Sequence, residues 1–553
     1  MLYFMKIESE KGAWKMKLEL MALPEQNKIM QSYYNDRNFL HTYFDYENSE
    51  RSFPKRYEEL SGRSFNRHGI AETVRMFMEP FGISESAAQH IDELENDAVT
   101  VIGGQQAGIL TGPLFSIHKA ISVILLAKKQ RAALGVPVVP VFWVAGEDHD
   151  LNEINHVYTE SDGHVRKKQI REKFVLKVMA SDAVFDQEDM AVFVEEIFSN
   201  FGETAYTKPL LEEVLNTVKL ETTFTGFFVR LMNGLFAEEG LLFIDSAYKP
   251  LRELEREYFM MLIKNSASIA ELVVSKEKQF DFDGFGNPLE AQENAANLFY
   301  LHETGRVLLS RRNGYFVNDS AGIRFTEEEL LSIAKEKPEL LSNNVATRPL
   351  MQDLVFPVLA FVGGPGEIAY WALLKETFHL FGLKMPIIVP RMSLTLVTRR
   401  TAKSLNERSF TFEDVLTGKV AIAQQAYINE LRDERLSLAI NSAEKLLIAE
   451  YEKMGDIVGE EDVMMNKLVQ KNLAFHTTQF NYLKGKAEDA LLIKHEVALR
   501  KFSGIEAELF PDETLQERVY TPYMYLNSYG PELIKDLLRL PMEFDGKHKV
   551  VYL

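Results

Sequence analysis

The sequence contains no cysteine, and this absence excludes several kinds of chemistry. Disulfides, cysteine-ligated zinc, iron–sulfur clusters and thiol nucleophiles all require a thiol group from the chain. Any covalent chemistry that the protein performs must therefore use another side chain or an activated small molecule.

Positive charge is in short supply, because 62 Lys and Arg residues stand against 81 Asp and Glu residues. Nucleic acid is therefore not expected as a partner, since phosphate backbones are bound by clustered Lys and Arg. No apolar run approaches the roughly 20 residues of a transmembrane helix, and the charged start of the chain has no signal-peptide h-region. We expect a cytoplasmic protein without a membrane partner, its 553 residues divided into three or four parts.

Residues 98–156 are predicted to form a strand, a glycine-rich loop, a helix and a second strand. The apolar runs 98–102 and 136–144 are typical of buried strands, and the residues between them include an apolar stripe at helical spacing. A strand–helix–strand unit of this length forms a right-handed parallel crossover. Polar residues follow both strands, at the edge where open α/β sheets bind ligands.

The first polar loop, residues 103–113, combines glycines with two adjacent glutamines. Its spacing matches neither the dinucleotide-binding pattern nor the P-loop, so its glycines can also be explained as a tight turn. The glutamines and a threonine at the start of a helix favour ligand binding, because N–H groups attract anions there. The binding candidates in this loop are Gln105, Gln106, Gly108, Thr111 and Gly112. His118 follows on the apolar stripe of the helix, where it is either a core histidine or a site residue.

Residues 147–150 form the most concentrated titratable cluster of the chain: Glu147, Asp148, His149 and Asp150. Such a group can bind a divalent metal or supply an acid and a base. Alternatively it is a polar loop in which Asp150 caps the next helix, which carries Asn155. Function is favoured, because carboxylates that directly follow a buried strand cost desolvation energy unless they are paired. Adjacent residues cannot all face one point, so two of the four at most should reach the reacting groups.

Further strands are predicted at 240–246, 355–362 and 386–390, and short β patterns at 280–330 indicate a β-rich insertion. Polar residues and glycines near these strands are second-tier binding candidates: Asn344, Arg348, Gly364, Gly366, Glu367, Tyr370 and Arg391. Arg348 could bind a carboxylate bidentately, although a surface arginine is the commoner outcome.

Beyond residue 394 the sequence is almost entirely helical. Apolar residues from Val469 to Val497 alternate spacings of four and three, which is an a/d seam with His476 and Lys494 as polar exceptions. The helix at 426–454 offers a partner face. Because an exposed seam would leave a large apolar patch in water, we expect a homodimer through this coiled coil.

Five long segments together strongly resemble the bacillithiol-biosynthesis cysteine-adding enzymes, the cysteine ligases of low-GC Gram-positive bacteria. They are VIGGQQAGILTGPLFSIHKAIS, PVVPVFWVAGEDHDLNEINHVY, SNNVATRPLMQD, FVGGPGEIAYWALLK and YLNSYGPELIKDLLRLP. The match is co-linear from about Met16 to Leu553. It implies an α/β fold with a Rossmann-like parallel-sheet core, two connecting insertions and a C-terminal α-helical coiled-coil domain that forms a homodimer.

On this plan the chain divides into seven segments. They are a helical lead-in with the first half of the core (1–160), a mainly helical connecting insertion (161–235), a core strand and helix (236–275), a β-rich connecting insertion (276–340), the second half of the core (341–394), the coiled-coil dimerisation domain (395–510) and a C-terminal segment packing on the coiled coil (511–553).

The resemblance also implies the last step of bacillithiol synthesis, in which cysteine is joined to glucosaminyl-malate by an amide bond. A carboxylate does not condense with an amine in water without activation, so we expect ATP as the driver, with Mg²⁺ as a candidate companion. A base must deprotonate the sugar amine, and Asp148 or His149 is assigned that role. His118 would stabilise the charge on the activated carboxylate, and Arg348 and Arg391 would neutralise the malate carboxylates.

Two other classes of function stay open at this point. A metal-dependent hydrolase would place a cation on Asp148 with His149 or Asp150. A non-catalytic scaffold would use the coiled coil to bind partners and leave the strand exits without a chemical role.

Overall fold

The computed structural model describes residues 2–3, 16–24, 27–161, 163–170, 178–432, 434–459 and 461–553. The chain divides into two compact units. Unit 1 contains nearly all described residues up to Leu396 and then resumes with Thr514–Leu553, whereas unit 2 is chiefly Val397–Glu513. Within the described residues, no helix is long and apolar enough to cross a membrane.

The core of unit 1 is a five-stranded parallel sheet in the order β14-β13-β3-β4-β7. Its strands are buried almost throughout, so they read as continuous apolar runs rather than as alternating patterns. This confirms the predicted α/β fold with a parallel core. The strands are β3 (Val99–Gln105), β4 (Val138–Val144), β7 (Leu242–Asp245), β13 (Val358–Gly363) and β14 (Ile387–Pro390).

Helix α6 (Leu114–Leu134) connects β3 to β4 and packs on both strands. It starts directly after Pro113 and ends at Gly135, whose φ of 69° is the left-handed conformation that glycine adopts without strain. Thirteen of its residues are buried, and these include His118 and Lys119. The helix therefore places two ionisable side chains inside the protein beside the exit of β3.

The remaining helices of the first part of unit 1 lie before β3, after β4 and after β7 in the chain. Before β3 lie α1 (Lys28–Asn35), α2 (Arg37–Tyr43), α3 (Ser52–Ser61), α4 (Arg67–Met78) and α5 (Glu85–Asn96). After β4 come the β5 (His156–Ser161) and β6 (His164–Gln169) strand pair and then α7 (Gln187–Asn200), α8 (Thr207–Leu220) and α9 (Phe224–Phe236). After β7 come α10 (Lys249–Lys264) and α11 (Ser266–Phe282). Helices α3, α4, α5 and α9 contact the strands of this sheet.

A second five-stranded sheet, in the order β11-β10-β9-β8-β12, lies where short β patterns were noted in the sequence. All its neighbouring strands are antiparallel. Its elements are β8 (Ala295–His302), β9 (Gly305–Arg312), β10 (Tyr315–Asn318), β11 (Ile323–Phe325) and β12 (Leu341–Asn343), with α12 (Glu327–Glu336) between the last two strands. The chain then returns to the parallel sheet through α13 (Arg348–Val355), and α14 (Pro365–Trp371) and α15 (Lys375–Leu380) follow β13.

A third sheet joins the two ends of the described chain, in the order β1-β2-β16-β15. Strand β16 (His548–Tyr552) pairs antiparallel with β2 (Lys17–Met21). Residues Thr514–Leu553, which were grouped with the coiled coil from the sequence, belong to unit 1. The other elements concerned are β1 (Leu2–Tyr3), β15 (Leu394–Val397), α22 (Pro522–Tyr529) and α23 (Glu532–Leu538).

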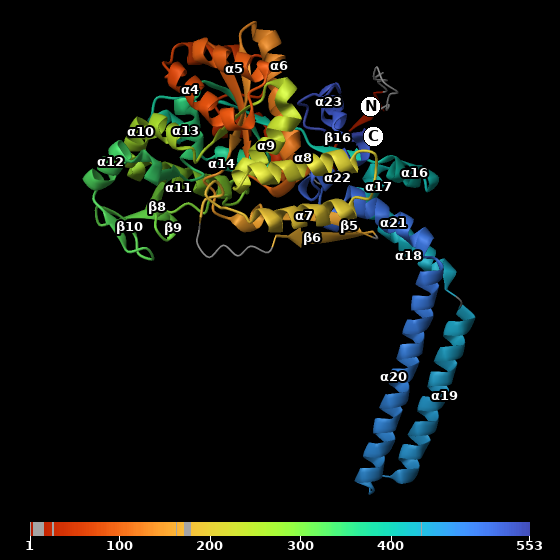
Figure 1. Ribbon diagram of the computed structural model, residues 1–553. Helices are drawn as coiled ribbons and strands as arrows, with labels where there is room; N and C mark the ends of the chain where they lie inside the picture. Colours follow the sequence, from red (N-terminus) through yellow and green to blue (C-terminus); the bar gives the residue numbers. More distant parts are fainter. Residues whose placement is uncertain are drawn as a thin grey trace. The chain divides into compact units, whose positions relative to one another are not determined.

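Unit 2 is helical, as predicted. Its two longest helices, α19 and α20, lie side by side as a hairpin (Figure 1). The helices of the unit are α16 (Arg399–Glu407), α17 (Phe412–Leu416), α18 (Lys419–Leu431), α19 (Glu434–Val458), α20 (Val463–Lys494) and α21 (Glu496–Leu509).

The predicted heptad seam holds over only the first half of α20. Val469 is buried and Phe480 is half-buried, but Leu483 is 50% exposed, and Val497, which lies beyond the end of α20, is 78% exposed. After Phe480 the less exposed side chain is Lys484, so the seam advances by four residues where the heptad requires three. A step of this kind is a stutter, which locally unwinds a coiled coil and turns the later apolar residues away from the partner helix.

Candidate functional site

A cavity of about 410 Å³ opens at the carboxyl ends of β3, β4 and β13. Its wall combines aromatic side chains with a small number of polar and charged groups, which is the usual make-up of a small-molecule site. The sequence predicted a site at this edge of the sheet. The lining residues are Gly104, Gln105, Gln106, Phe115, Lys119, Trp143, Ala145, Asp148, Arg348, Phe361, Gly364, Pro365, Gly366, Glu367, Tyr370, Arg391 and Arg518.

Cations outnumber carboxylates on this wall. Lys119 and three arginines face two carboxylates, Asp148 and Glu367. The arginines come from three separate places in the chain, at positions 348, 391 and 518. A wall of this composition favours an anionic ligand, because guanidinium groups bind carboxylates and phosphates through paired hydrogen bonds.

The two glutamines after β3 face the cavity and contact other groups on its wall. Gln106 donates a hydrogen bond of 2.6 Å to Asp148, and Gln105 accepts one of 3.1 Å from Lys119. Gly104 has a packing role as well, because a Cβ atom there would lie 2.5 Å from the carbonyl oxygen of Trp143. The glycine thus lets β3 approach β4 closely, and the glutamines carry the polar surface.

The rest of that loop does not line the cavity. Leu110 and Thr111 both have positive φ, at 49° and 65°, and both are buried. Gly108 crosses Gly112 so closely that a Cβ at position 108 would lie 2.7 Å from the Gly112 Cα. Thr521 bonds the Leu110 carbonyl at 2.8 Å and so holds the turn. The predicted ligand contacts of Gly108, Thr111 and Gly112 are replaced by a structural role in this turn.

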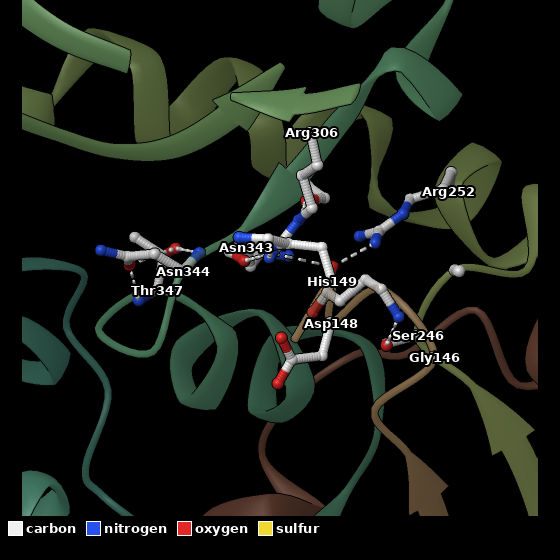
Figure 2. Close-up of polar contacts among 12 residues, drawn as sticks. Gly146, Asp148, His149, Ser246, Arg252, Arg306, Asn343, Asn344 and Thr347 are labelled. Atoms are coloured by element: carbon white, nitrogen blue, oxygen red, sulfur yellow. Dashed lines mark hydrogen bonds and ion pairs between the residues drawn. The ribbon is translucent and has the colours of Figure 1, made fainter. Parts of the chain in front are cut away.

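The four residues 147–150 diverge, as their adjacency required. Asp148 alone lines the cavity, and it points away from Arg252 and Arg306 (Figure 2). His149 lies beside Arg306, with 3.4 Å between its Nδ1 and an arginine Nη1. Asp150 is exposed. Asn155 lies outside the cavity too, and its side chain accepts a 3.1 Å hydrogen bond from Gln169.

Glu147 belongs to a buried ion cluster on the far side of this loop. Arg252 bonds both Glu147 and Glu255, the latter at 2.7 Å. Burial raises the pKa of Glu255 to about 7. The neighbouring Asp245 accepts a 3.1 Å hydrogen bond from the Gly146 amide, and burial raises its pKa to about 6. This cluster, called here the Arg252 cluster, anchors the loop that presents Asp148.

His118, predicted to act on the reacting groups, is fully buried and does not line the cavity. Its Nδ1 lies 2.9 Å from Glu517, and burial lowers the pKa of the imidazole despite that carboxylate. Glu517 in turn accepts hydrogen bonds from Arg391 and from Ser393. Burial tends to raise the pKa of Glu517, but the Arg391 charge and these hydrogen bonds hold it well below its ordinary value. We call this group, with the Leu394 amide, the Glu517 cluster.

Two further pairs of cavity residues are hydrogen-bonded to each other, Arg348 with Tyr370 and Lys119 with Glu367. Arg348 donates a 2.7 Å hydrogen bond to the Tyr370 hydroxyl, and burial raises the pKa of that phenol to about 12. Lys119 bonds Glu367 and also the Gly104 carbonyl, at 2.6 Å, while burial lowers its pKa.

Asn344, in contrast, lies outside the cavity. Its side-chain oxygen accepts hydrogen bonds from the amides of Ala346 and Thr347, at 3.0 and 3.1 Å. It shapes the turn before α13 (Figure 2).

The residues at or beside this site that sequence reasoning missed include three charged ones, Lys119, Glu517 and Arg518. A lysine within a helix that is otherwise buried was a usable signal for Lys119, because a buried ammonium requires partners. Nothing in the local sequence marks residues 517 and 518, since their partners lie far away along the chain. Among the described residues, no group of three or more His, Cys, Asp or Glu side chains could hold a metal ion.

Two family descriptions match the chain. "Bacillithiol biosynthesis BshC, N-terminal Rossmann-like domain" matches residues 16–392, and "Bacillithiol biosynthesis BshC, C-terminal coiled-coil domain" matches residues 394–553. A relative from Lysinibacillus sphaericus named "Putative cysteine ligase BshC" is 44% identical over 97% of this chain and its own full length. Relatives of the same name from Geobacillus thermodenitrificans and Bacillus velezensis are each 37% identical, again over 97% of this chain and all of their own.

Proposed function

Because this chain belongs to the bacillithiol biosynthesis BshC family and is a ligase, we propose that it joins cysteine to glucosaminyl-malate. The bond formed is an amide between the cysteine carboxylate and the sugar amine, in the last step of bacillithiol synthesis. The observation that carries the proposal is the charge pattern of the cavity, where several cations share one wall with Asp148. The cations suit the malate carboxylates, and the aspartate suits the amine.

The amine is the group that most needs help from the chain. It is protonated near neutral pH and must lose a proton before its lone pair can attack a carbonyl carbon. Asp148 is the proposed base, because it lines the cavity and Gln106 fixes its orientation. His149, the alternative base, contacts Arg306 and the Phe299 ring and does not line the cavity.

The cysteine carboxylate is activated by ATP in this proposal. Transfer of an adenylyl or phosphoryl group to the carboxylate oxygen releases pyrophosphate or ADP, and attack by the amine then releases AMP or phosphate. The wall fits a nucleotide phosphate through the guanidinium groups of Arg348 and Arg518. A Mg²⁺ ion would be held mainly by the phosphates with one carboxylate, for which Asp148 and Glu367 are the candidates.

Replacing the proposed base tests this function. In the purified full chain, Asp148→Asn should lower kcat for amide formation roughly 100-fold or more, because general bases contribute at least that much. The matched control is Glu153→Gln, an exposed carboxylate in the same loop that should keep wild-type activity. The amide product is measured through a label on its cysteine thiol. The released nucleotide is quantified as well, because AMP indicates adenylyl transfer and ADP indicates phosphoryl transfer. Wild-type activity in Asp148→Asn would refute the assignment.

A homodimer through the α19–α20 hairpin completes the proposal. Several large apolar side chains of these helices are exposed, among them Leu438 (63%), Leu446 (70%) and Phe475 (62%). Covering them against a second copy would remove this apolar surface from water. Light scattering at micromolar concentration should give twice the monomer mass, and a strict monomer would contradict this part.

The hypothesis that the protein is a non-catalytic scaffold predicts a different result in cells from the ligase hypothesis. A deletion strain complemented with Asp148→Asn should lack bacillithiol if the protein is the ligase. It should keep normal bacillithiol if the hairpin alone carries the function.

A further inference from the structure

Arg391 sits where two cavities meet. It lines the 410 Å³ cavity described above and also a neighbouring cavity of about 240 Å³. Glu517 binds it from behind through both terminal nitrogens, at 2.9 Å from Nη1 and 2.8 Å from Nη2. The other N–H group of Nη1 donates a hydrogen bond of 3.1 Å to the Met392 carbonyl oxygen. The guanidinium plane is thereby fixed.

This arrangement leaves one edge of Arg391 available. A guanidinium has five N–H donors in a rigid fork, and Glu517 and Met392 use three of them. The two others, on Nε and Nη2, lie along the same edge, and no acceptor in the described part of the chain is bonded to them. Gly364 lies beside this edge, where even a Cβ atom would come within 3.7 Å of Nε. The absence of a side chain at Gly364 therefore leaves room for a ligand.

Glu517 is itself held rigidly. It is 2% exposed, and besides Arg391 it accepts hydrogen bonds from Ser393 at 2.8 Å and from the Leu394 amide at 3.1 Å. The His118 ring fixes the same carboxylate from helix α6. Two segments of the chain, residues 391–394 and helix α6, thus set the position of the Glu517 carboxylate, and this carboxylate in turn orients the Arg391 guanidinium.

We propose that Glu517 is a positioning residue that orients Arg391 so that its Nε–Nη2 edge binds a planar carboxylate of the substrate. This inference rests on the proposed function, and under it the ligand is a malate carboxylate of glucosaminyl-malate. The Glu517 charge offsets the Arg391 charge, so recognition depends on two parallel hydrogen bonds more than on net charge. A lysine cannot supply that geometry.

The inference predicts that substitutions in this pair change the KM for glucosaminyl-malate much more than they change kcat. Glu517→Gln keeps the size of the side chain but removes the charge and one acceptor, so Arg391 loses its fixed plane. The KM for glucosaminyl-malate should rise roughly 10- to 100-fold, the range expected for a lost charge-assisted hydrogen bond, with kcat changed by less than about threefold. Arg391→Lys should raise KM by a similar factor although it keeps the positive charge. Glu513→Gln, an exposed glutamate four residues earlier, is the control and should behave as wild type.

Calorimetry with malate as the probe separates this inference from the proposed function. The purified full chain should bind malate, and Glu517→Gln and Arg391→Lys should each bind it at least about tenfold more weakly than Glu513→Gln does. If Glu517→Gln lowers only Tm and leaves malate affinity and KM unchanged, Glu517 is merely structural and the inference fails while the ligase function stands. If the wild type binds no malate, the ligand class is wrong and the inference also fails. If malate affinity falls as expected but wild-type protein forms no amide product, the inference stands and the proposed function fails.

Discussion

The Arg252 cluster and the Glu517 cluster are both buried ion groups beside the cavity, and burial raises the pKa of a carboxylate in each, yet the net pKa shifts of Glu255 and Glu517 are opposite. In the Glu517 cluster one carboxylate receives donors from Arg391, His118, Ser393 and the Leu394 amide, and its pKa falls well below the ordinary value. In the Arg252 cluster the pKa of Glu255 rises to about 7.

The number of donors for each carboxylate explains this contrast. Arg252 is shared between Glu147 and Glu255, and one Glu255 oxygen has no hydrogen-bond partner among the described residues. Desolvation then dominates and favours the protonated form. Where donors are plentiful, hydrogen bonding to the charged form outweighs the same desolvation cost. Burial alone therefore does not decide whether a carboxylate stays ionised.

The largest expected effect on stability comes from removing Arg252, the cation that Glu147 and Glu255 share in the Arg252 cluster. Arg252→Met should lower the free energy of unfolding by about 3–5 kcal/mol, because it leaves the buried Glu255 without its counter-charge and Glu147 with only Arg306, 3.9 Å away. Arg391→Met should cost less, since Glu517 keeps three other donors. Urea unfolding measures both. Arg256→Met, whose partner Glu253 is on the surface, should change stability by less than about 1 kcal/mol. Equal losses for Arg252 and Arg391 would remove the contrast.

A smaller effect should appear in the pH dependence of stability. The pKa of Asp245, beside the Arg252 cluster, is raised by burial to about 6, so the folded state holds a proton that the unfolded state releases near pH 4. Its contribution to stability is present at low pH and is lost as pH rises from about 4 to about 6, by up to about 3 kcal/mol.

Asp245→Asn should remove that fall, so its stability relative to wild type should improve between pH 4.5 and 7. Urea unfolding at both pH values measures the change, with the exposed Asp150→Asn as control. An unchanged slope in Asp245→Asn would show that burial does not raise this pKa.

The smallest expected effect on stability comes from removing one of the hydrogen-bond donors in the Glu517 cluster. Ser393→Ala removes one donor to Glu517 and should lower the free energy of unfolding by about 1 kcal/mol near neutral pH. The pKa of Glu517 is depressed in the folded state, so its stabilisation is present above the unfolded pKa and is lost as pH falls. The Ser393→Ala difference should therefore shrink in acid. A difference that stays constant with pH would mean that Ser393 acts through its contact with His548 instead.

The parallel sheet could be predicted from the sequence because each strand is a short apolar run buried on both faces. The cavity edge followed from the same reasoning, since parallel strands bring their carboxyl ends together. The heptad register beyond Phe480 could not be predicted, because a stutter depends on how α20 meets α19.

Site residues near the strand exits could be found from their positions, and Gln105, Gln106, Asp148 and Glu367 do line the cavity. The direction of a side chain within a loop was beyond the sequence, so Glu147 and Asp148 were grouped although they face opposite ways. Glu517 was out of reach for a different reason. Its partner His118 is 399 residues earlier, and no local pattern records a contact of that range.

That separation has a consequence for the order in which a newly made chain can acquire its site. At a synthesis rate of roughly 5–20 residues per second, His118 is made about 20–80 s before Glu517. During that interval the His118 imidazole, and later Arg391 once it has been made, lack the carboxylate that joins them. The wall of the cavity is thus completed late in translation, when the whole of unit 2 has already been made.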